Sequence, residues 1–265
     1  MQIADLSYRN YDGPLESPTF RWWVISRTSI LRAFKTKGYW VATALSGWYY
    51  LVMIAVLFFI EQATAAQSQG QAQGMGLTDT FLRKIVWKDQ FLHGFSFAQL
   101  LILVTALLLG AGAIANDNRA NALLVYLSKP CTKADYMIGK WVGIFLPVLL
   151  MMVIPSTVFY LYGLLSFRDY GFFADDPWIG PKMVLIMTLS AALHASLVLA
   201  ISSMFQQGRI AGAVYAGLYF LTTFFTKLMQ VAYAIKHGEE VGPIGTLFYC
   251  SVDGIQIGLA KAILG

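Results

Sequence analysis

The chain alternates between long apolar runs and shorter polar segments. The apolar runs cover residues 39–60, 91–115, 136–165, 181–204 and 210–234. Each run has the ~20 residues that an α-helix needs to cross a bilayer. Because the runs are continuous, they lack the alternation of a transmembrane β-barrel strand. The pattern predicts an all-α, polytopic membrane protein, a helical bundle with five clear spans.

The composition narrows the class further. Hydrophobic residues make up 57% of the chain and charged residues 12%, whereas a soluble domain carries about 25% charged residues. The net charge of +5 would suit nucleic acid, but Lys and Arg gather at the ends of the apolar runs rather than on one polar face. Retention of basic loops on the cytoplasmic side explains this distribution. We therefore predict no nucleic-acid partner.

The positions of the basic residues predict the orientation. Of the 19 Lys and Arg residues, 11 lie in residues 1–38, in residues 114–140 and at Arg209, with only five of the 14 acidic residues. Segments rich in Lys and Arg stay on the cytoplasmic side of a membrane. The first 38 residues also lack the apolar core of a signal peptide. We expect a multi-pass protein of the bacterial inner (plasma) membrane with a cytoplasmic N-terminus.

The two ends of the chain depart from simple spans. Residues 1–38 form a cytoplasmic arm whose second half is basic and aromatic, which favours an amphipathic helix in the membrane interface over an ordinary cytoplasmic helix. Residues 39–265 form the transmembrane domain. Residues 242–265 contain Asp253 at their middle, which costs about 2.5–3.5 kcal/mol in a spanning helix. We interpret this segment as a re-entrant pair of short helices or, alternatively, as a sixth span. Pro147 and Pro155 predict a kink in the third run.

The polar segment 114–140 has the features of a docking loop. An acidic and a basic residue are followed by an apolar patch with helical spacing, a proline and a basic stretch. The residues concerned are Asp117, Arg119, Leu123, Leu124, Leu127, Pro130, Lys133, Gly139 and Lys140. A short helix here would expose one apolar face. This face could dock a soluble partner, or it could touch only lipid head groups.

This segment resembles the loop between the second and third spans in membrane subunits of type 2 ABC exporters. Asp117 occupies the acidic position of that loop, Leu123 its leucine, Pro130 its proline, Lys133 its basic position and Gly139–Lys140 its Gly-Lys pair. This sequence departs from the pattern in three places: Asn121–Ala122 replaces Gly-Thr, an aspartate replaces the usual glutamate, and a lysine replaces the usual arginine.

The resemblance implies a permease subunit that couples to a separate ABC ATPase through loop 114–140. It also implies a second permease subunit, in a homodimer or a heterodimer, surrounded by membrane lipid. ATP and magnesium would be bound by the ATPase, so we expect this chain to hold no cofactor and to catalyse no reaction. In agreement, the sequence has no phosphate-binding loop, no metal-ligand spacing and no nucleophile elbow.

Two ionisable residues lie inside the apolar segments. His194 is near the centre of the fourth run, and Asp253 lies in the C-terminal segment. Either could line a transport path. Alternatively, His194 could be a neutral, hydrogen-bonded core residue, and Asp253 could cap a helix.

Small residues predict where helices pack closely. Ala192, Ser196 and Ala200 form a stripe on the face of the fourth run opposite His194, and Gly208 and Gly212 form a GxxxG motif. Two other functions remain open, namely a structural or assembly subunit of a larger membrane complex and an intramembrane enzyme using His194 or Asp253.

Overall fold

The computed structural model describes residues 20–68, 85–122, 131–168, 172, 176–237 and 249–265. These residues contain α-helices and no β-strand, as the apolar runs predict. In chain order the helices are α1 (Arg21–Lys35), α2 (Lys37–Ser46), α3 (Trp48–Ser68), α5 (Trp87–Gly110), α6 (Ala115–Arg119), α8 (Lys133–Ser166), α9 (Ile179–Ser203), α10 (Gly208–His237) and α12 (Val252–Leu264).

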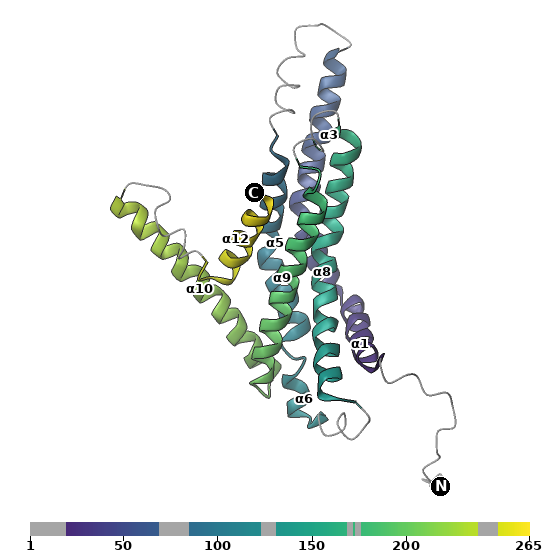
Figure 1. The fold of residues 1–265 in the computed structure, drawn as a ribbon, viewed down its shortest axis with the longest axis vertical. Coiled ribbons are helices and arrows are strands. Elements are labelled where there is room, and N and C mark those ends of the chain that lie inside the picture. The colour runs from purple at the N-terminus through teal and green to yellow at the C-terminus, as the bar shows by residue number, and fades with distance from the viewer. Residues whose placement is uncertain (1–19, 69–84, 123–130, 169–171, 173–175, 238–248) are drawn as a thin grey trace, which may run out of the picture.

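Four helices stand side by side in the main bundle. Figure 1 shows α3, α5, α8 and α9 upright, with α1 and α6 at the same end of the bundle. The turn between α9 and α10 lies at that end too. From there α10 leaves the bundle at an angle, and α12 packs against α9, α10 and α5.

The prediction of five clear spans is not confirmed. Three helical segments of the described chain are long and apolar enough to cross a membrane: Trp87–Arg119, Lys133–Ser166 and Ile179–Ser203. A fourth crossing is possible if α2 and α3, which meet at 43°, count as one broken span. The predicted fifth span forms as α10, but its tyrosines, threonines, glycines and Lys227 dilute its apolar character.

The C-terminal segment contains one short helix. With 13 residues, α12 measures about 20 Å at 1.5 Å per residue, less than the ~30 Å of a hydrocarbon core. It does not span by itself, and residues 242–248 lie outside the described part. Its N-cap is Ser251, whose hydroxyl accepts from the Gly254 amide, so Asp253 is not the capping residue.

The break in the first span is paired with a proline in α8. At Gly47, where α2 ends, an added Cβ would lie 2.8 Å from the Cβ of Pro155. Pro155 has no N–H, so the carbonyl of Met151 loses its partner within α8. The Ser46 hydroxyl donates to this carbonyl at 3.2 Å. The expected single span at residues 39–60 is therefore bent, because Gly47 lets the chain approach the proline.

The end of the bundle opposite α6 is closed by aromatic rings. This aromatic end consists of Tyr50, Trp87, Phe91, Phe159, Phe167 and Phe172, all at most 3% exposed. Trp87 meets Phe172 edge-on with ring centroids 4.7 Å apart, and Phe159 lies 5.1 Å from Phe91. Rings from α3, α5 and α8 and from residues 167 and 172 thus hold this end by apolar contact.

Candidate functional site

The first part of the 114–140 segment folds into a small unit centred on α6. Helix α5 ends at Gly110, and the chain turns before α6 begins at Ala115. Ser202, a fully buried residue of α9, holds this turn. Its hydroxyl oxygen accepts from the Ile114 and Ala115 amides at 3.1 and 3.0 Å and donates to the Ala111 carbonyl at 2.8 Å. One side chain therefore satisfies the backbone groups that the break leaves without partners.

Two asparagines join α6 to the end of α9, the turn after it and the start of α10. The Asn118 amide donates to the carbonyls of Ser203 and Phe205 at 3.3 and 3.4 Å. The Asn116 side-chain oxygen accepts from the Gly208 amide at 3.3 Å. A Cβ on Gly208 would lie 2.8 Å from the Gly112 Cα, so this position needs a glycine. Gly212 lies one turn further along α10, and a Cβ there would be 3.3 Å from that of Ala111.

An ion pair joins α6 to α8. The Asp117 carboxylate lies 2.8 Å from the Lys140 ammonium and accepts a hydrogen bond from the Tyr136 hydroxyl at 2.8 Å. The side chains of Asp117 and Lys140 are 21% and 13% exposed. Such a partly shielded pair is less screened than a surface pair. We call α6 with Asn116, Asp117, Asn118, Lys140 and Ser202 the polar end of the bundle.

Helix α8 is anchored at its first turn and along its glycines. Thr132 and Asp135 form a capping box at the start of the helix. Sequence reasoning missed this box, although the pattern Thr-x-x-Asp before an apolar run is its signature. Further along, a Cβ on Gly139 would lie 2.7 Å from that of Ile25, and the Ser26 hydroxyl donates to the Gly139 carbonyl at 3.1 Å. Gly139 therefore serves the crossing of α8 with α1.

The predicted coupling residues differ in their surroundings, and some of them lie outside the described residues. Asp117 and Lys140 are brought together, and Gly139 is buried under α1. Lys133 is exposed at the start of α8. Leu123, Leu124, Leu127 and Pro130 lie outside the described residues. Arg119 and Arg209 are both exposed and line an open groove of about 930 Å³ between α5 and α10.

The predicted path residues lie in a second polar cluster, where α9, α10 and α12 meet. His194 is fully buried; its Nδ1 lies 2.6 Å from the Tyr215 hydroxyl and its Nε2 2.9 Å from the amide nitrogen of Gln256. That amide nitrogen also donates to the Val252 carbonyl, and the amide oxygen accepts from Ser190. Since Gln256 donates, Nε2 accepts and Nδ1 carries the proton. The imidazole is neutral and joins three helices.

The other residues of this region differ in exposure. Asp253 is 7% exposed and accepts a hydrogen bond from Thr223 of α10 at 2.8 Å. Ser196 and Ala200 of the small-residue stripe are exposed, and Ala192 is half-buried. The Ser196 hydroxyl accepts from the Trp141 indole at 3.0 Å. The opposite face of α9, with His194, is the one that packs inside the described chain.

A comparison with protein families identifies the family of this chain. The family model described as "ABC-2 family transporter protein" matches residues 23–257, which is most of the chain. A search of curated proteins finds no match. The matched region includes α6, the capping box of α8 and the cluster around His194.

Proposed function

The chain belongs to the ABC-2 family of transporter proteins, and we propose that it is the permease subunit of an ATP-driven exporter in the bacterial inner membrane. ATP hydrolysis takes place on a separate ABC ATPase, which binds ATP and magnesium. Two permease subunits, identical or different, complete the membrane part. The chain itself is not an enzyme.

The single observation that carries the coupling proposal is the bonding of α6. This five-residue helix is joined to the end of α9 through Ser202 and Asn118, to the start of α10 through Asn116, and to α8 through Asp117. It directly precedes the segment 123–130, whose leucines we propose as the ATPase contact. A displacement of that segment reaches three membrane helices through one small unit.

The arrangement of the bundle supports a cytoplasmic N-terminus. Helices α1 and α6 and the turn between α9 and α10 share one end of the bundle (Figure 1). The parts of the sequence that contain these elements, residues 1–38, residues 114–140 and Arg209, carry 11 of the 19 Lys and Arg residues. Basic segments remain on the cytoplasmic side, where the ATPase is also located.

The energetic requirement for coupling is a difference in affinity. ATP must bind one arrangement of the ATPase pair better than the other, because a ligand shifts an equilibrium only by its differential affinity. The polar end can rearrange where water reaches it, because the links of Asn116, Asn118 and the Asp117–Lys140 pair are at least partly exposed and can be exchanged for bonds to water. The apolar parts of α5, α8 and α9 then move as packed bodies.

A two-part experiment separates docking from transmission. The chain is purified in mild detergent together with its bound partners, and mass spectrometry identifies an ABC ATPase among them. We expect the double substitution Leu123→Asp/Leu127→Asp to release the ATPase, because charges desolvated at an apolar contact are costly. We expect Asp117→Asn to retain the ATPase but to reduce the permease-dependent change in its ATP hydrolysis.

The control places a similar charge at the other end of the bundle. Leu165 is 82% exposed near the end of α8, and Leu165→Asp should leave the ATPase bound. Retention of the ATPase by the Leu123/Leu127 variant would refute docking through this loop. Unchanged ATP hydrolysis in Asp117→Asn would refute transmission through α6.

A further inference from the structure

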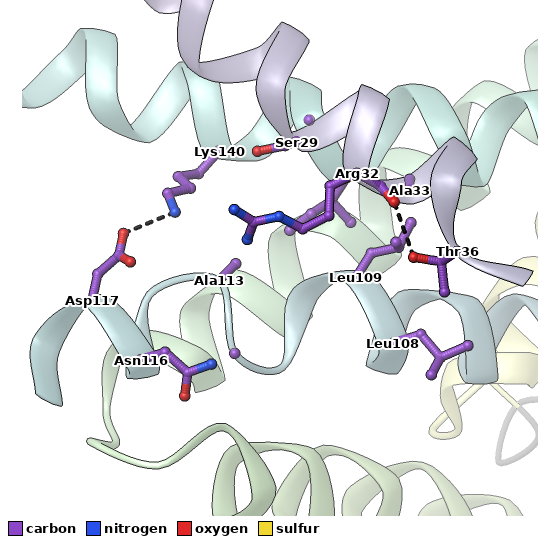
Figure 2. A pocket seen from close by; sticks show the side chains of 13 residues that line it. Ser29, Arg32, Ala33, Thr36, Leu108, Leu109, Ala113, Asn116, Asp117 and Lys140 are labelled. Atoms are coloured by element: carbon purple, nitrogen blue, oxygen red, sulfur yellow. Dashed lines mark hydrogen bonds and ion pairs between the residues drawn. The ribbon is translucent and has the colours of Figure 1, made fainter. Parts of the chain in front are cut away.

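A cavity lies between α1, the turn from α5 to α6, and α8. Its volume is about 210 Å³, and its walls include Ser29, Arg32, Leu108, Asn116, Asp117 and Lys140. Figure 2 shows the Arg32 side chain extending from α1 into this space, towards the ion pair of Lys140 and Asp117. Three residues of the polar end, Asn116, Asp117 and Lys140, therefore form part of the cavity wall.

The charges in the cavity are unbalanced. Lys140 is paired with Asp117. The Arg32 guanidinium, in contrast, has no ion pair or hydrogen bond to any residue in the described part of the chain. One acid therefore faces two cations, which leaves one positive charge on Arg32, a residue that lines the cavity and is also exposed. A guanidinium presents five N–H donors in a fork that matches the oxygens of a phosphate.

The apolar residues in the cavity wall indicate where the cavity lies relative to the apolar spans. Leu108 and Leu109 belong to the last turn of α5, and Ile144 belongs to α8 within its apolar run. On the outer surface of α1, Trp23 and Leu31 are 42% and 46% exposed. An exposed indole and basic residues on an amphipathic helix are typical of the level of lipid head groups. The cavity thus lies where the apolar span gives way to polar surroundings.

The volume restricts the size of the ligand. A water molecule occupies about 30 Å³ of liquid, so ~210 Å³ holds a phosphate group with a few attached atoms. Sites for whole drug-sized molecules range over about 300–1,000 Å³. The cavity accordingly suits a head group better than a complete transported molecule.

We propose that this cavity binds a phosphate group, with the Arg32 guanidinium as its main donor and Ser29 at its side. The phosphate belongs to the head group of an anionic membrane lipid, whose glycerol end contacts Leu108 and Leu109. Occupancy of the site links α1 to the turn that precedes α6. This proposal does not depend on the direction of transport or on the ATPase.

The test is a lipid titration of the full-length chain purified in detergent. Thermal stabilisation is measured against phosphatidylglycerol, phosphatidylcholine and inorganic phosphate at constant ionic strength. We compare wild type with Arg32→Ala, Arg32→Lys and the control Arg27→Ala. Arg27, like Arg32, is an exposed arginine of α1, but it does not line the cavity. Native mass spectrometry then counts the lipids that each variant retains.

We expect saturable stabilisation by phosphatidylglycerol. Loss of a charge-assisted hydrogen-bond pair should raise the half-saturating concentration about tenfold or more in Arg32→Ala. Arg32→Lys should show a smaller loss, because it keeps the charge but not the fork. Arg27→Ala should bind like wild type. If inorganic phosphate alone stabilises the protein and Arg32→Ala abolishes the effect, the phosphate site stands and a soluble phosphate is its source.

Two results would overturn the proposal. The first is equal lipid and phosphate titrations for wild type and Arg32→Ala, since the guanidinium would then contribute nothing. The second is an equal loss in Arg27→Ala and Arg32→Ala, which would indicate general attraction of a basic helix to anionic lipid.

Discussion

The two ends of the bundle are built by different kinds of contact. At the aromatic end, buried rings from α3, α5 and α8 pack against one another, edge to face between Phe91 and Phe159 and tilted between Tyr50 and Phe159. At the polar end, α6 is held by hydrogen bonds and one ion pair, between residues far apart in the sequence. Close-packed apolar contact resists deformation, whereas hydrogen bonds can be exchanged for bonds to water.

This difference teaches how one bundle can be stable and still respond to a partner. The aromatic end supplies rigidity through burial, which is lost only if the rings separate. The polar end has discrete links that can be broken and remade singly. A permease needs both properties, because a force applied at one end must move helices without unfolding them.

The largest effect is expected at Phe159, a ring of the aromatic end. This ring is fully buried and contacts Tyr50, Trp87 and Phe91. Phe159→Ala should lower the free energy of unfolding by about 3–5 kcal/mol, because it leaves a cavity that neighbouring rings cannot fill. Thermal unfolding in detergent measures the effect. Phe224→Ala is the control, since this ring of α10 is 67% exposed; an equal loss in both variants would contradict a packed aromatic end.

A smaller effect is expected at Ser202. Ser202→Ala removes the partner of two amides and one carbonyl in the turn before α6, which should cost about 1–3 kcal/mol. Ser203→Ala provides a matched control, because the Ser203 hydroxyl donates only to the Ala200 carbonyl of its own helix. We expect this control to change stability by less than about 0.5 kcal/mol. Hydrogen exchange of the amides at 114 and 115 should accelerate in Ser202→Ala alone; similar exchange in both variants would show that Ser202 does not hold the turn.

The smallest effect is expected from the charges beside the aromatic end. A hydrogen bond from Lys182 at 2.7 Å is the main cause that lowers the pKa of Asp176, and the Trp178 amide and Lys88 act in the same direction. A carboxylate with a lowered pKa stabilises the fold above its ordinary pKa, and this contribution is lost as the pH falls through the lowered value. Lys88 and Lys182 are 32% exposed, so screening keeps the effect small.

The measurement is the unfolding temperature of wild type and Asp176→Asn from neutral pH to acid. The variant should be less stable near neutral pH, and the two curves should converge as Asp176 of the wild type becomes protonated. A constant difference between the curves at all pH values would show that the charge of Asp176 is not the cause. If the curves converge, the ionised carboxylate of Asp176 contributes to the stability of the aromatic end, which is otherwise held by apolar contacts.

Sequence reasoning located most of the secondary structure and part of the site. The apolar runs predicted the positions of α5, α8 and α9 to within a few residues, since continuous apolar character reflects burial in lipid or in the bundle. Pro147 and Pro155 were recognised, but neither predicts that the first span bends at Gly47. That bend depends on which helix lies opposite the proline, and no local pattern contains this information. The same holds for α10, whose helix was predicted but whose angle to the bundle was not.

Within the candidate site, the motif in residues 114–140 included Asp117 and Lys140, but it did not predict that their side chains form an ion pair. Residues 23 positions apart meet only because α6 turns back beside α8. Ser202 was not singled out, because a serine at the end of an apolar helix has no distinguishing signal. Its role depends on the turn of another helix that lies 87 or more positions earlier in the chain.

What the sequence by itself determined is the class of protein, the helical runs and the residues able to form an ion pair, whereas the docking role of loop 114–140 stays a proposal. These follow from hydropathy, charge and residue type, which are local properties. The tertiary structure decided which of these residues meet, that Gly139 packs under α1, that His194 is a buried link among α9, α10 and α12, and that Arg32 extends into a cavity. Such contacts depend on the packing of helices from distant parts of the chain, because a side chain's chemistry becomes a site only when the fold supplies its neighbours.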